Sequence, residues 1–214
     1  KSPDYTDKLK ALKDAYINKL TGDEREMSNL TLNDLKDINS IFAKSPDYTE
    51  KLKALNDAYL DQFINDENDN MSYLWLLLKD INEMLVESPH DEDKLKALND
   101  AYINKLTGDE RNMSNLTLNN LKDINEMLVE SPHDEEKLKA LNDAYLDQFI
   151  NNSKKLSELS SFDLKDINRL FAKNPDYTEK LKAFNDAYLD QFINDENDNI
   201  SYLWLFKLKD INEM

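Results

Sequence analysis

The stretch SPDYTEKLKALNDAYLDQFI, residues 45–64, decides the fold, because it returns almost unchanged as NPDYTEKLKAFNDAYLDQFI at residues 174–193. The two stretches begin 129 residues apart, which is three times 43. Related stretches begin after each Ser-Pro or Asn-Pro dipeptide, so that one anchor residue recurs every 43 residues: Ser2, Ser45, Ser88, Ser131 and Asn174. A fixed period between 20 and 50 residues indicates a tandem repeat.

Each copy of the repeat is predicted to contain two amphipathic helices. The first helix begins with the anchor residue as N-cap and Pro at its first position, where the missing N–H costs nothing. Apolar residues of the first copy recur at the spacing of one helix face, namely Leu9, Leu12, Ala15, Tyr16 and Leu20. Gly22 and Gly108 are expected to end this helix in the first and third copies with a left-handed residue.

The second helix is located from the Asp-Ile-Asn motif that every copy shares. In the first copy this helix is predicted to present one apolar face, made of Leu35, Ile38, Ile41 and Phe42. Thr31-x-x-Asp34 and Ser160-x-x-Asp163 match the pattern of a capping box, with Asp in the acidic position. These patterns place the start of the second helix seven residues before the core Ile in the first, third and fourth copies.

Neither helix can bury its apolar face alone, so neighbouring copies are expected to stack. The predicted fold is therefore an all-α solenoid, elongated and curved, in a single array of five copies: residues 2–44, 45–87, 88–130, 131–173 and a truncated 174–214. We expect the chain to be a segment of a longer repeat protein. The period and the helix pairing resemble the HEAT and armadillo class of helical repeats. The tetratricopeptide signature is absent, and the resemblance concerns architecture alone, so it implies no function.

Composition narrows the classes of partner. The net charge is −17 and there is no cysteine. The charge disfavours nucleic acid and anionic membranes, which bind through Lys and Arg, and favours a protein or peptide of basic character. The absence of a long apolar run disfavours membrane insertion, and we expect no cofactor.

The clearest candidates for partner contacts lie between the two helices and at the start of the second helix. The loop of the second copy contains Asp66, Asn68 and Asn70, and the loop of the fifth copy contains Asp195 and Asn197. Loops on a rigid scaffold often carry recognition, although neutral drift explains their variation equally well. The helix starts contribute a further set of candidates, Tyr73, Trp75, Leu76 and Trp204.

The two tryptophans differ in register. Trp204 precedes the core residue Ile211 by seven positions, which places it on the core face. Trp75 precedes Ile81 by six positions, about 100° further round a helix of 3.6 residues per turn. Trp75 therefore either forms an apolar surface patch with its neighbours Tyr73 and Leu76 or packs between copies.

Metal binding and catalysis are poorly supported. Asp66-x-Asn68-x-Asn70 resembles the start of a calcium loop, but the turn Gly and the twelfth-position Glu are missing. His90 and His133 stand one copy apart, too far for a shared metal ion. No catalytic constellation is recognisable. Six Asn-x-Ser/Thr sequons also occur, which Asn-rich loops before Ser or Thr caps would generate by themselves: Asn29, Asn70, Asn112, Asn115, Asn151 and Asn199.

Asparagine recurs inside both helices, although it is a mediocre helix residue. The first helices carry Asn56, Asn99, Asn142 and Asn185, and the second helices carry Asn39, Asn82, Asn125, Asn168 and Asn212. A hydrogen-bonded ladder between copies, or bonds to a loop, would compensate for the lower helix propensity. Duplication from one ancestor explains the recurrence without either.

These patterns predict a non-enzymatic scaffold that binds a protein or peptide through its inter-helix loops and second-helix starts. The alternative is a structural protein that assembles into a filament or surface array through open repeat ends. Compartment is not determined, although block duplication slightly favours a secreted or cell-surface protein.

Overall fold

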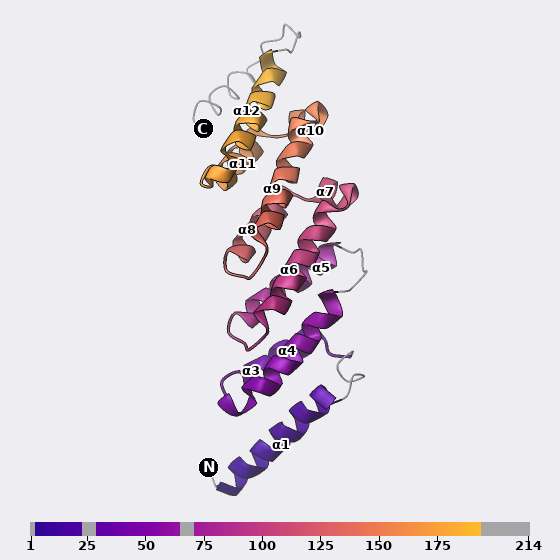
Figure 1. Ribbon diagram of the computed structural model, residues 1–214, viewed down its shortest axis with the longest axis vertical. Helices are drawn as coiled ribbons and strands as arrows, with labels where there is room; N and C mark the ends of the chain where they lie inside the picture. Colours follow the sequence, from indigo (N-terminus) through magenta and orange to yellow (C-terminus); the bar gives the residue numbers. More distant parts are fainter. Residues whose placement is uncertain (1–2, 23–28, 65–70, 194–214) are drawn as a thin grey trace. The chain divides into compact units, whose positions relative to one another are not determined.

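The structure is a computed structural model that describes residues 3–22, 29–64 and 71–193. Every regular element in these ranges is a helix (Figure 1). None of the described helices combines the length and the apolarity that crossing a membrane requires. The predicted all-α class is therefore confirmed.

The helices alternate between two kinds. The long helices that follow each anchor residue, here called A helices, are α1 (Pro3–Gly22), α4 (Thr49–Ile64), α6 (Glu92–Thr107), α9 (Glu135–Ile150) and α12 (Thr178–Ile193). The helices that contain Asp-Ile-Asn, here called B helices, are α3 (Leu32–Phe42), α5 (Met71–Leu85), α8 (Leu118–Val129) and α11 (Ser161–Phe171). Two short α-helices, α7 (Glu110–Asn115) and α10 (Ser153–Ser157), lie between an A helix and the next B helix.

The start of the A helix differs from the prediction. Ser45 makes no side-chain cap hydrogen bond, and Pro46–Tyr48 forms a 3₁₀ turn before α4 begins at Thr49. At Asn174 the same turn, Pro175–Tyr177, is capped by the Asn side chain. In the third and fourth copies the A helix begins at Glu92 and Glu135, after an irregular loop. The prediction of Pro at the first position of the A helix is wrong there because the chain must first turn back from the preceding B helix.

The capping boxes are confirmed. Thr31 Oγ1 accepts a hydrogen bond from Asp34 N, and the Asp34 carboxylate accepts one from Thr31 N. Ser160 and Asp163 form the same reciprocal pair. The glycine prediction is only half right: α1 ends at Gly22 and α6 ends just before Gly108, but neither glycine has a positive φ angle.

The described helices belong to two compact units. The first contains residues 1–104 and 127–134, and the second contains residues 105–126 and 135–214. In the first unit α1 packs along α4, while α3 packs against both α4 and α5. In the second unit α9 packs along α12, which also contacts α11 (Figure 1). Within each unit, A helices therefore pack on A helices and each B helix packs on the A helix that follows it.

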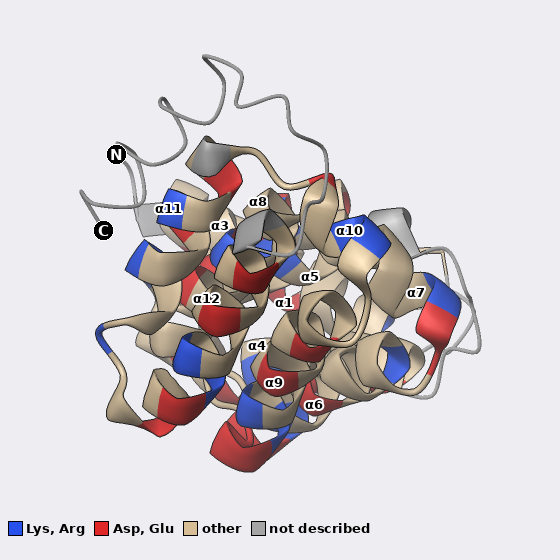
Figure 2. Cartoon of the chain, turned by 90° about the horizontal axis from the view of Figure 1, so that it is seen from above, with Lys and Arg blue, Asp and Glu red and all other residues tan. Residues whose placement is uncertain are grey.

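The core of each unit lies between these layers. It is built from the Leu and Ile residues of the B helices, such as Leu35 and Ile38, and the Leu and Tyr residues of the A helices, such as Leu55 and Tyr59. Ile41, which was expected on the same face as Ile38, is instead 51% exposed. Burying aliphatic and aromatic side chains of this kind stabilises the fold by about 1.5–3 kcal/mol each. Both lysines and acidic residues occur along helices such as α9 and α12 (Figure 2).

Candidate functional site

All of the predicted loop candidates, and Trp204 of a predicted helix start, lie outside the described residues. These are Asp66, Asn68, Asn70, Asp195, Asn197 and Trp204. Tyr73 belongs to the first turn of α5, and Leu76 is largely exposed. The structure therefore places only part of the predicted set.

Of the two alternatives left open for Trp75, the surface patch is contradicted by the structure. Its side chain is only 8% exposed. The indole ring lies 6.1 Å from the ring of Tyr102, which comes from the next A helix, α6. Burial also raises the pKa of the Tyr102 phenol well above its usual range. Trp75 thus packs between copies, the second alternative, because α6 covers the flank on which the helical wheel places this ring.

The recurring asparagines form pairs between a B helix and the following A helix. In α3 and α4, Nδ2 of each of Asn39 and Asn56 donates to Oδ1 of the other, at 2.8 and 2.9 Å. Three further pairs repeat this exchange at the same 17-residue separation: Asn82 with Asn99, Asn125 with Asn142, and Asn168 with Asn185. Each pair joins one copy to the next, so the first alternative suggested for these residues, a hydrogen bond between copies, is realised.

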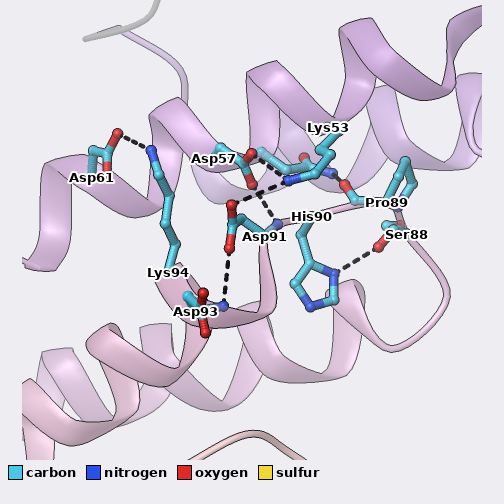
Figure 3. A network of polar contacts seen from close by, with 10 residues as sticks. Lys53, Asp57, Asp61, Ser88, Pro89, His90, Asp91, Asp93 and Lys94 are labelled. Atoms are coloured by element: carbon cyan, nitrogen blue, oxygen red, sulfur yellow. Dashed lines mark hydrogen bonds and ion pairs between the residues drawn. The ribbon is translucent and has the colours of Figure 1, made fainter.

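The bond to a loop occurs where the third and fourth copies begin. We call residues 88–91 and 131–134 the SPHD junctions. At the first of them, Asn56 Nδ2 donates to the Pro89 carbonyl at 2.9 Å, and Asp57 Oδ1 accepts from Asp91 N at 2.6 Å (Figure 3). Lys53 lies 2.9 Å from Asp57 and 3.5 Å from Asp91. One turn of α4 therefore holds the loop of the next copy through two backbone groups and a shared cation.

The second SPHD junction repeats this geometry. Asn99 Nδ2 donates to the Pro132 carbonyl at 2.9 Å, and Asp100 accepts from Asp134 N at 2.8 Å. His90 and His133 take part within their own loops, where Nδ1 lies 2.8 and 2.9 Å from the carbonyl oxygens of Ser88 and Ser131 (Figure 3). These contacts give the two histidines a structural role in holding the loops.

The second and fifth copies begin differently, at what we call the PDYT junctions, residues 45–49 and 174–178. Here a buried tyrosine packs against the end of the preceding B helix. Tyr48 packs edge-on against Phe42 at a ring distance of 4.9 Å, and Tyr177 packs against Phe171 at 5.0 Å. The sequence shows this correlation, since Phe-Ala-Lys precedes both PDYT junctions and Leu-Val-Glu precedes both SPHD junctions.

Ion pairs add a second connection between helices of one kind. Lys36 of α3 lies 3.1 Å from Asp80 of α5, and Lys122 of α8 lies 2.6 Å from Asp166 of α11. Among A helices, Lys180 lies 2.7 Å from Asp147, and Lys94 pairs with Asp61 (Figure 3). Such exposed pairs contribute about 0–1 kcal/mol each, so they favour one register of neighbouring copies more than they add stability.

Among the described helices, α1 exposes a row of apolar side chains. Leu9, Leu12 and Tyr16 of α1, here called the α1 stripe, are 37%, 66% and 47% exposed. This corrects the expectation that the apolar face of the first copy is core: only Leu20 of the predicted set is buried, together with Ile17. Tyr5, which precedes the α1 stripe on the same helix, is also exposed.

The equivalent positions of the other A helices show what normally covers this surface. Leu12 corresponds to Leu55, Leu98, Leu141 and Phe184, all of which are buried. Tyr16 corresponds to Tyr59, Tyr102, Tyr145 and Tyr188, which are likewise buried. For α4 and α12 the covering element is the preceding B helix, which packs directly against them. The α1 stripe is therefore a surface of the kind that receives a B helix.

The described residues contain no cluster of three or more His, Asp or Glu side chains that could hold a metal ion. Comparison of the chain with protein-family models, with curated proteins and with solved structures found no match. The functional interpretation therefore depends on the geometry of the copies themselves.

Proposed function

We propose that this chain is a non-enzymatic helical-repeat scaffold that binds a protein or peptide partner through its inter-helix edges and second-helix starts. The observation that carries this proposal is that α7 and α10 lie at the same edge of successive copies, each with one buried apolar anchor, Met113 or Leu156, and different charged side chains. Surface segments held on a rigid scaffold often carry recognition.

The specificity of binding would depend on the charges that this edge presents in each copy. In the third copy this edge is α7, which is anchored by buried Met113 and presents exposed Glu110 and Arg111. In the fourth copy it is α10, which is anchored by buried Leu156 and presents exposed Lys154. The same position in successive copies thus has a fixed apolar anchor and a variable charged surface, an arrangement that favours selective recognition.

Self-assembly is the second candidate function. It is favoured by the fact that B helices of the chain itself cover the residues equivalent to the α1 stripe. A B helix of a second molecule of the chain therefore has the apolar side chains that would pack on this stripe. A heterologous contact of this kind would continue from molecule to molecule without closing.

Light scattering after size-exclusion chromatography separates the two candidates. The molar mass would be measured over a hundredfold range of protein concentration, for the wild-type chain and for Leu12→Asp. A constant mass of 25.0 kDa supports partner binding and rules out assembly through the α1 stripe. A mass that rises with concentration in the wild type, but not in Leu12→Asp, would instead establish self-assembly.

A further inference from the structure

One aspartate of the A helices is more deeply buried beside the SPHD junctions than at its other described positions. Asp57 and Asp100, which accept hydrogen bonds from these loops, have side chains that are 15% and 10% exposed. Their equivalents in the A helices next to the PDYT junctions, Asp14 and Asp143, are 39% and 27% exposed. The same residue of the repeat is therefore most sheltered where an SPHD junction lies on it.

Three charged side chains form this contact at the first SPHD junction, and we call Lys53, Asp57 and Asp91 its carboxylate latch. Asp57 Oδ1 accepts from the Asp91 backbone N–H at 2.6 Å, and the Asp91 carboxylate accepts from Asp93 N of α6 at 3.0 Å (Figure 3). Lys53 Nζ lies 2.9 Å from the Asp57 carboxylate and 3.5 Å from the Asp91 carboxylate. Both acceptors in the latch are thus carboxylates, and one ammonium group pairs with both.

The second SPHD junction has the same latch, made of Lys96, Asp100 and Asp134. Asp100 accepts from Asp134 N at 2.8 Å, and Lys96 Nζ lies 2.7 Å from Asp100 and 3.9 Å from Asp134. Because the same three residue types meet at both junctions, the latch is a property of the SPHD junction itself.

The histidine of each SPHD junction belongs to the same loop but does not form part of the latch. His90 Nδ1 lies 2.8 Å from the carbonyl oxygen of Ser88 (Figure 3). A carbonyl oxygen only accepts, so Nδ1 carries the proton in the neutral ring. A second proton would add to Nε2 and would leave this hydrogen bond in place. The carboxylates are therefore the groups whose protonation changes the contact.

The PDYT junctions are held mainly by groups that take up no proton in acid. At each of them a tyrosine ring packs on the last phenylalanine of the preceding B helix. The Tyr177 hydroxyl also accepts a hydrogen bond from Asn142 Nδ2. The ion pair between Lys10 and Asp47 beside the other PDYT junction is exposed to solvent, which screens it. Acid should therefore weaken the SPHD junctions and spare the PDYT junctions.

We propose that the two SPHD junctions are acid-sensitive joints, in which protonation of the latch carboxylates opens residues 88–91 and 131–134 while the helices and the PDYT junctions stay folded. A proton from solvent adds to each carboxylate, and the neutral carboxyl is a weaker hydrogen-bond acceptor than the anion. Lys53 and Lys96 then lose the charges with which they pair. The asparagine pairs between B and A helices do not titrate, so the helices remain packed.

The pH range of the opening follows from the direction of one pKa shift. The Asp93 N–H and the Lys53 ammonium group lower the pKa of the Asp91 carboxyl below its ordinary value. The contribution of such a group is complete above the unfolded value of about 3.9 and is lost as the pH falls through the folded value. The joints are therefore closed at neutral pH and open below about pH 4. This inference does not depend on the proposed function.

The test is amide hydrogen exchange of the full chain, followed residue by residue by nuclear magnetic resonance from pH 7 to pH 2.5 and corrected for the intrinsic exchange rate at each pH. We expect the protection of the Asp91 and Asp134 amides, which donate to the latch carboxylates, to fall about ten-fold below pH 4. The Tyr48 and Tyr177 amides, which donate to backbone carbonyls of the PDYT junctions, should keep their protection.

Two matched variants locate the proton. Asp57→Asn should lower the protection of the Asp91 amide already at pH 7 and remove most of its pH dependence, while Asp134 behaves as in the wild-type chain. Asp143→Asn makes the same change in an A helix next to a PDYT junction and should leave both SPHD junctions unaltered. His90→Ala should leave the pH of the transition unchanged.

Three results would overturn the inference. The Asp91 and Asp134 amides could stay protected down to pH 2.5, which would show that the latch does not open. Protection could be lost at the same pH in both kinds of junction, which would make the event global unfolding. The transition could instead lie near pH 6.5, the ordinary range of imidazole, and disappear in His90→Ala, which would assign it to the histidine.

Discussion

Asn39 and Asn56 each donate one side-chain hydrogen bond to the other, so the two amides form a closed pair between α3 and α4. Both residues are almost completely buried. Asn39 Nδ2 also donates to the Leu35 carbonyl, and Asn56 Nδ2 also donates to Pro89. The pair thus connects two helices and the loop of the following copy.

Replacing Asn56 by Ala should destabilise the chain by about 2 kcal/mol. The change leaves Asn39 Oδ1 and the Pro89 carbonyl without these partners, a larger effect than the gain of up to about 0.7 kcal/mol in helix propensity. Urea denaturation followed by circular dichroism measures the difference. Asn18→Ala, at an exposed position of α1, is the matched control and should be neutral or slightly stabilising. Equal effects of the two variants would show that the pair contributes nothing.

Replacing Trp75 by Ala should cost about 3 kcal/mol in the free energy of unfolding, since it removes a buried ring from its contact with Tyr102. The neighbouring Leu76→Ala should change stability by less than about 0.5 kcal/mol, because Leu76 is 64% exposed. Thermal or urea denaturation of both variants provides the comparison. A larger loss for Leu76→Ala than for Trp75→Ala would contradict the burial seen here.

The two PDYT junctions provide a matched pair of tyrosines. The hydroxyl of Tyr177 accepts a hydrogen bond from Asn142 Nδ2 at 3.0 Å, whereas that of Tyr48 reaches the Lys10 carbonyl only at 3.4 Å. Tyr177→Phe should therefore destabilise by about 1 kcal/mol, and Tyr48→Phe by less than about 0.5 kcal/mol. Both rings stay packed on their phenylalanines, so the difference isolates the hydroxyl. If Tyr48→Phe lowers the free energy of unfolding more than Tyr177→Phe does, the hydrogen bond between Asn142 and Tyr177 does not account for the contribution of the hydroxyl.

Stability should be greatest in a plateau between about pH 5 and pH 10. Hydrogen bonds and lysines lower the pKa of Asp34, Asp47, Asp91 and Asp166. Their contribution is complete above the unfolded value of about 3.9 and is lost as the pH falls through the lower folded values.

The same argument with the opposite sign applies to lysine. Pairing with Asp47, Asp57, Asp100 and Asp143 raises the pKa of Lys10, Lys53, Lys96 and Lys139. This contribution is complete below the unfolded pKa of about 10.4 and is lost as the pH rises through the higher folded values. Urea midpoints measured from pH 2.5 to 11.5 should therefore fall at both ends. A midpoint that stays constant from pH 7 to pH 3 would contradict the acidic limb.

The sequence by itself determined the local structure of the chain, that is, its helices and their caps. The all-helical class and the capping boxes at Thr31 and Ser160 are confirmed, the latter because a cap is formed by atoms within one turn of chain and needs no tertiary partner. The sequence also contained the correlation between Phe42 and Tyr48, although it could not be interpreted without knowing which helices meet.

Only the tertiary structure decided which apolar surfaces are covered. Trp75 and Leu12 have similar chemistry in an amphipathic pattern, yet Trp75 is buried by α6, whereas Leu12 remains exposed on α1. The pattern of one helix gives the direction of its apolar face. Burial also depends on a second helix at that face, and therefore on contacts between residues far apart in the chain. The same reason explains the asparagines, whose cost within a helix is offset by a partner 17 residues away and a carbonyl 33 residues away.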